Sequence, residues 1–131
     1  MRTSVGGAVA RMLLDGGFDE VFARPPSARE HPEPIVCTQG AFERASRARG
    51  EERGTVSVEV LVVRGSPEEA GRDALRAETR LRRCAWEPYA QLGGRMRILG
   101  KETSVPGLRE RDASGRWVWG FTVTVWVARE V

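Results

Sequence analysis

The clearest pattern in the chain is an alternation of large apolar and smaller side chains near its end. Every odd position from 117 to 127 carries tryptophan, phenylalanine or valine, while the even positions include two threonines and Trp126. A period of two is typical of a β-strand that buries one face. We therefore predict a long strand over residues 115–128, with its odd-numbered side chains in the core.

A second alternating segment predicts another strand over residues 55–64. Val56, Val58, Val60 and Val62 share one face, and the opposite face also becomes apolar toward the end. Shorter extended segments are expected over residues 18–23, 35–39 and 95–105. Asp and Gly at the first and last positions of residues 112–115 predict a turn that makes the final strand half of a hairpin.

Two helices are predicted from apolar residues at helical spacing and from their start and stop signals. The first covers about residues 3–14, with Thr3 or Ser4 as the N-cap. The second begins at Ser66-Pro67-Glu68-Glu69, which is typical of a capping box with proline at the first helical position, and continues to about Trp86. The predicted fold is a single α+β domain with a mostly antiparallel or mixed sheet of four to five strands and both helices on one face.

The segment between the two central strands, residues 40–54, is rich in charge and poor in apolar residues. It holds four arginines, Arg44, Arg47, Arg49 and Arg53, together with three glutamates. This composition predicts a flexible loop. Its balanced charge and single aromatic residue disfavour a nucleic-acid-binding arm.

The chemistry of the chain points away from catalysis. With 131 residues and a net charge of +3, the sequence has one histidine, His31, in a proline-rich loop that we expect to be solvated. Cys37 and Cys84 have no metal-ligand spacing and are expected to be buried free thiols. We find no nucleophile, phosphate-binding or metal motif and no membrane-spanning apolar run. We therefore expect a protein that is not an enzyme, with no cofactor and no metal.

Trp126 stands apart from the other tryptophans of the final strand. Trp117 and Trp119 share the apolar face, whereas Trp126 lies on the opposite face beside threonines. It either packs within the molecule, for instance against the first helix, or contacts a partner, as exposed tryptophans often do.

The order of elements resembles that of phage tail terminators, also known as minor capsid or head–tail joining proteins. The resemblance lies in the valine-rich strand over 56–63, the capped helix from Ser66 and the hairpin that ends in GRWVWGFTVTVWVA. It implies a non-enzymatic virion-assembly protein that forms a homo-oligomeric, usually hexameric, ring on the tail tube. The implied partners are tail-tube and head-completion proteins, and the implied location is the bacterial cytoplasm during assembly and then the virion. The resemblance also implies that the charged loop reaches a partner, which makes Arg44, Arg47, Arg49 and Arg53 candidate contact residues beside Trp126.

Two other functions remain open at this point. One is a small ligand-binding or nucleic-acid-binding α+β module of bacterial origin, which salt-sensitive binding to DNA or RNA would favour. The other is a small enzyme, which needs a deep pocket with convergent polar groups.

Overall fold

The computed structural model describes residues 4–131, which form two α-helices and one seven-stranded sheet. The helices are α1 (Val5–Asp15) and α2 (Pro67–Arg83). The strands are β1 (Val21–Phe22), β2 (Ile35–Ala48), β3 (Glu51–Arg64), β4 (Gln91–Leu92), β5 (Met96–Thr103), β6 (Gly107–Arg111) and β7 (Trp117–Glu130). The α+β class is confirmed, but the sheet has more strands than predicted.

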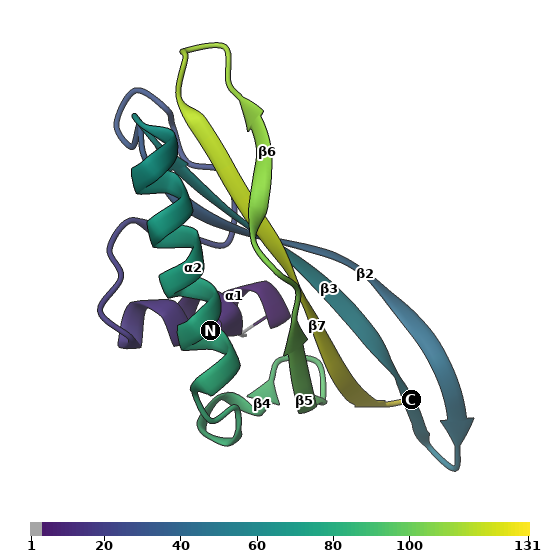
Figure 1. Cartoon of the computed structure of the whole chain (residues 1–131). Coiled ribbons are helices and arrows are strands. Elements are labelled where there is room, and N and C mark those ends of the chain that lie inside the picture. The colour runs from purple at the N-terminus through teal and green to yellow at the C-terminus, as the bar shows by residue number, and fades with distance from the viewer. Residues whose placement is uncertain (1–3) are drawn as a thin grey trace.

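The final strand, β7, lies at the centre of the sheet (Figure 1). β3 pairs with β7 along its whole length, from Arg64 opposite Trp117 to Glu51 opposite Glu130. On the other side of β7, β5 and β6 lie end to end. β2 extends the sheet beyond β3, and β1 is parallel to β2 while all other pairs are antiparallel. The predicted strand over 115–128 is therefore present, shifted by two residues.

Both helices cover the same face of the sheet (Figure 1), as predicted. The even-numbered valines of β3 and the odd-numbered residues of β7 pack against them. Phe121, Val58 and Leu13 are fully buried there, and burial of this apolar surface is the main term that stabilises the fold. Cys37 is buried in the same core and Cys84 is half-buried, and both are free thiols.

The helix ends follow their capping chemistry. The hydroxyl of Ser4 accepts a hydrogen bond from the Gly7 amide at 2.9 Å, and the hydroxyl of Ser66 accepts one from the Glu69 amide at 3.2 Å. Thr3, the alternative cap, lies outside the described residues. α2 ends at Arg83, three residues before the predicted end, where Cys84 adopts an extended conformation. The chain then forms a short 3₁₀ turn over Glu87–Tyr89, which lets Trp86 and Tyr89 pack against the core.

The predicted turn before β7 is confirmed. The Asp112 amide donates to the Arg116 carbonyl at 2.7 Å, and its carboxylate accepts from the Ser114 and Arg116 amides. Gly115 closes the turn at φ 86°, a left-handed conformation that favours glycine.

The prediction of a loop over residues 40–54 is wrong in its secondary structure. β2 continues to Ala48 and β3 begins at Glu51, so the segment is the outer half of a β-hairpin with its tip at Arg49 and Gly50. The prediction failed because strand pairing along β7 and contacts between charged side chains replace the apolar alternation that marks a strand in the sequence.

Candidate interaction surface

The outer half of the β2–β3 hairpin, residues 40–54, projects beyond the helices and is called the arm here (Figure 1). Within the arm, β3 pairs with β2 on one side and with β7 on the other. Arg129 and Glu130 of β7 lie opposite Glu52 and Glu51. The Val131 amide also donates to the Gly50 carbonyl at 2.9 Å. The arm is thus a continuation of the sheet.

On the face that continues the core side, Glu52 joins three strands. Its carboxylate accepts from Arg44 of β2 at 3.0 Å and from Arg129 of β7 at 3.1 Å. Glu52 is only 7% exposed, which is unusual for a glutamate unless it is paired. The bond from Arg44 holds the pKa of Glu52 below its ordinary value, with Arg129 adding to the effect and desolvation opposing it.

Next to the Glu52 carboxylate, Arg129 also contacts the aromatic ring of Phe42 on the same face of the sheet. The guanidinium of Arg129 lies 4.0 Å from the centre of the Phe42 ring, a cation–π geometry. The ring in turn lies over Gly54, because a Cβ at position 54 would be 2.9 Å from Phe42 Cζ and 2.1 Å from the Glu43 carbonyl oxygen. The close approach of β2 and β3 here requires glycine at position 54.

On the opposite face, the neighbouring glutamate makes the equivalent link. Glu51 accepts from Arg53 at 2.8 Å and from Arg97 of β5 at 3.2 Å. These two bonds hold its pKa below the ordinary value. Arg53 and Arg97 both pair in register with Ala128, which is fully buried although it lies on the face away from the helices. Consecutive glutamates next to the tip therefore tie β3 of the arm to its neighbouring strands on both faces.

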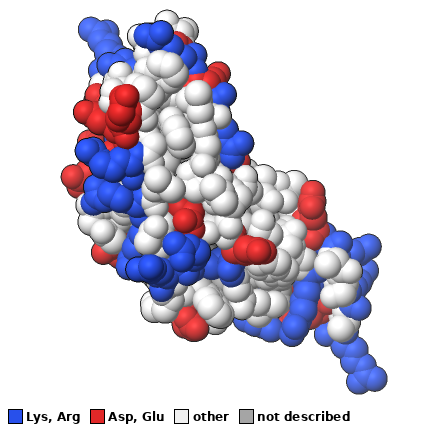
Figure 2. Space-filling view, in the orientation of Figure 1, with Lys and Arg blue, Asp and Glu red and all other residues white. Residues whose placement is uncertain are grey.

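The four predicted arginines divide into two groups. Arg44 and Arg53 are held by Glu52 and Glu51. Arg47 and Arg49, nearer the tip, form no salt bridge with any residue of 4–131. Figure 2 shows basic side chains gathered at this end of the surface. Two exposed guanidinium groups at the tip are thus available to a partner.

The fifth predicted residue, Trp126, lies at the base of the arm. It pairs with Thr55 on one side and Gly100 on the other, and it is 40% exposed. It lies on the face away from both helices, so the alternative that it packs against α1 is excluded. By strand alternation it shares its face with Arg53. The structure therefore brings all five candidates to one end of the molecule.

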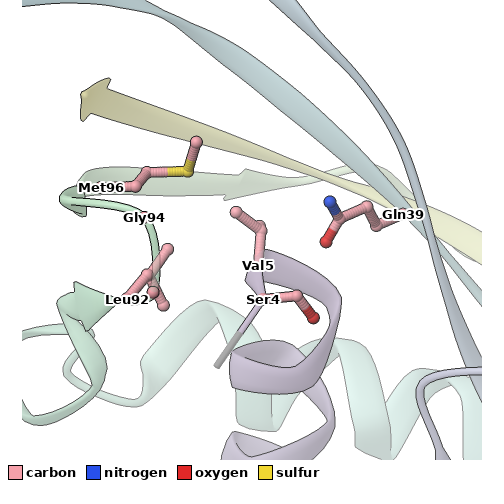
Figure 3. A pocket seen from close by; sticks show the side chains of 7 residues that line it. Ser4, Val5, Gln39, Leu92, Gly94 and Met96 are labelled. Carbon is pink, nitrogen blue, oxygen red and sulfur yellow. The ribbon is translucent and has the colours of Figure 1, made fainter. Parts of the chain in front are cut away.

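A cavity of about 310 Å³ opens between the start of α1 and the β4–β5 turn (Figure 3). Val5, Leu92 and Met96 provide its apolar side chains, and no ionisable side chain of residues 4–131 lines it. The Gln39 side-chain oxygen at its edge accepts from the Gly6 amide at 2.9 Å. The described lining of the cavity is therefore mostly apolar.

Among residues 4–131, we identify no catalytic arrangement of the remaining titratable groups. His31 contacts the carboxylate of Glu20 and the ring of Phe22, so it is less solvated than predicted. Burial raises the pKa of the Cys37 thiol to about 12. In residues 4–131 there is no cluster of three or more metal-ligating side chains, and no helix there has the length and apolarity needed to cross a membrane.

Comparison with known proteins gives no family assignment. The chain matches no protein-family model, and no curated protein sequence is significantly similar to it. The arguments on function therefore rest on the residues described above.

Sequence reasoning missed the two glutamates and Phe42 as organising residues of the arm. Glu51 and Glu52 had been counted only as neutralising charge. A signal was present, since strand alternation continues from Val56 back through Gly54 and Glu52 on one face. The arginine partners on β5 and β7 could not be assigned without knowing the strand order.

Proposed function

We propose that this chain is a non-enzymatic virion-assembly protein of the tail-terminator kind, which forms a homo-oligomeric ring at the head-proximal end of a phage tail tube. The observation that carries the proposal is the joint position of a paired, projecting arm and an exposed tryptophan at its base. Partners are then other copies of this chain, the tail-tube protein and head-completion proteins.

The arm suits protein contact because its backbone is ordered before binding. An element that is already paired loses less conformational entropy on association than a loop that must first fold. Arginine and tryptophan are also the residue types that dominate the energetics of protein interfaces. Both stand at this end of the molecule.

Ring formation adds a geometric requirement that the shape of the chain supports. In a closed ring, two different surfaces of each protomer meet. A projection at one end supplies one of these surfaces, and the helix-backed body offers the other. The hexameric state implied by the family resemblance is part of the proposal.

The test measures assembly and stability in parallel. Mass by light scattering is recorded for the wild type and Trp126→Ala, alone and with a candidate tail-tube protein, and thermal unfolding is recorded for both. We expect Trp126→Ala to reduce the assembled fraction while the melting temperature changes little. Val105→Ala is the matched control, because Val105 is 87% exposed and far from the arm in the strand register.

Two outcomes would count against the proposal. One is a wild type that stays monomeric at high concentration and also in the presence of the tail-tube protein. The other is a Trp126→Ala variant that loses stability but assembles normally once folded. Portal, capsid and tail-tube genes beside this gene would support the class, and a neighbourhood without phage genes would oppose it.

A further inference from the structure

The outer edge of β2 is the longest unpaired strand edge in the described part of the chain. β2 has 14 residues, but β1 pairs only with Ile35 and Val36. From Thr38 to Ala48, no strand among residues 4–131 pairs with the side of β2 that faces away from β3. An unpaired edge presents backbone amides and carbonyls that can bind another strand.

The side chains along this edge leave its backbone accessible. Five of the positions between 38 and 48 carry glycine, alanine or serine, and there is neither proline nor lysine among them. Proline and lysine are residues with which proteins commonly protect an edge from pairing. Residues 43–48 are all exposed. The edge is thus open to an extended segment.

The charge at this edge selects the kind of segment. Arg47 and Arg49 have no ion-pair partner within residues 4–131, because Glu52, which lies opposite Arg47 in the register, is occupied by Arg44 and Arg129. Glu43 is the one acidic residue of β2. A partner strand with carboxylates would accept charge-assisted hydrogen bonds from these guanidinium groups.

Two observations disfavour a second copy of this chain as the partner. β2 has register shifts after Gln39 and after Arg44, and such bulges twist an edge and interrupt long, flat pairing between identical strands. The exposed strand β6 carries two arginines and one glutamate, so it offers no acidic face to β2. A short acidic segment of another protein avoids both obstacles.

We propose that the β2 edge over residues 38–48 binds an extended acidic segment of a partner protein by strand addition. Backbone hydrogen bonds to β2 supply the affinity, and Arg47 and Arg49 select for carboxylates. The inference rests on the proposed role of the arm as a partner-binding element. Its test does not require a ring, so its failure is distinguishable from a failure of ring assembly.

The test is an NMR titration of the ¹⁵N-labelled full chain with a blocked decapeptide of alternating glutamate and threonine. We expect the largest shifts at amides 38–48, and slower hydrogen exchange at those β2 amides that do not bond to β3. A peptide with lysine in place of glutamate, and an acidic peptide with prolines in place of two threonines, should both bind much more weakly.

Two protein variants sharpen the result. Arg47→Glu with Arg49→Glu should weaken binding of the acidic peptide about tenfold or more, since two attractive pairs become repulsive. Arg29→Glu with Arg83→Glu is the control, with the same change in net charge at exposed sites outside β2. Ala45→Pro, placed at the second bulge where proline is tolerated, should block binding without loss of the folded spectrum.

Four outcomes would overturn the proposal. They are the absence of shifts at millimolar peptide, shifts centred on Trp126 or on the cavity near Val5, equal binding of the lysine peptide, and concentration-dependent broadening of amides 38–48 without peptide. The last result would identify a second copy of the chain as the occupant of the edge.

Discussion

The same strand, β3, passes through two regions that are held together in different ways. In the body, Val58 and Val60 are fully buried under the helices. In the arm no helix of residues 4–131 covers β3, and its side-chain contacts are made by Glu51, Glu52 and the stacked Phe42 and Arg129. The comparison shows that a strand can leave the core and stay ordered when side-chain pairs across strands replace apolar burial.

The largest expected effect lies in the body. Phe121→Ala should lower the free energy of unfolding by about 3–5 kcal/mol, because it empties a fully buried site between the sheet and the helices. Phe42→Ala in the arm should cost only about 1–2 kcal/mol, since the ring is partly exposed and loses one cation–π contact. Urea unfolding of both variants measures the difference. Equal losses of unfolding free energy would mean that the arm is part of the core, and they would contradict the difference between arm and body.

The next effect is confined to the arm. Gly54→Ala should destabilise by about 1–3 kcal/mol, because the new Cβ would lie 2.1 Å from the Glu43 carbonyl oxygen and force β2 away from β3. Gly40→Ala is the matched control in the same hairpin, with its nearest contact at an ordinary 3.4 Å. Unfolding midpoints and the NMR spectrum of arm residues give the comparison. Similar behaviour of the two variants would refute the close packing described at Gly54.

Acid should loosen the arm before the body. The pKa values of Glu51 and Glu52 are lowered in the fold by their arginine partners. Their contribution is therefore complete above the ordinary value of 4.5 and disappears as the pH falls through the lowered folded values. Amide spectra recorded from neutral to acidic pH should lose dispersion first in residues 42–54. Simultaneous loss in arm and body would contradict the separate stabilisation of the arm.

The smallest expected effect tests a polar atom in the body. The indole Nε1 of Trp119 is buried and has no hydrogen-bond partner within residues 4–131. Trp119→Phe removes this donor, whose unpaired burial costs about 1–3 kcal/mol, and this gain offsets the lost packing against Gly71. Stability measured by urea unfolding should change by less than about 1 kcal/mol. A clearly larger loss would indicate that Nε1 has a partner, such as a bound water.

The sequence pattern predicted the body well because buried strands and helices carry apolar residues at regular spacing. The alternation around Phe121 placed β7 to within two residues, and Ser66 and Pro67 marked the start of α2. The end of α2 was less predictable. Its last turn depends on tertiary packing of Trp86 and Tyr89, which no local signal records.

The arm was mispredicted because its strands also depend on tertiary contacts that leave no local signal in the sequence. Glu51 and Glu52 of the arm pair with Arg97 and Arg129, which lie far from them along the chain. From composition alone, a segment this rich in charge is predicted to be a solvated loop. The candidate residues Arg44, Arg47, Arg49, Arg53 and Trp126 lie at one end of the molecule, and their contact with a partner stays a prediction.

Hydrogen exchange of the isolated protein at neutral pH tests the central claim, that the arm is a preformed part of the sheet. If the claim holds, the amides of β3 over residues 51–54 that pair with β2 and β7 exchange far more slowly than those of an unstructured peptide, without any partner present. Exchange of the whole segment 40–54 at unstructured rates, with the body protected, would contradict it.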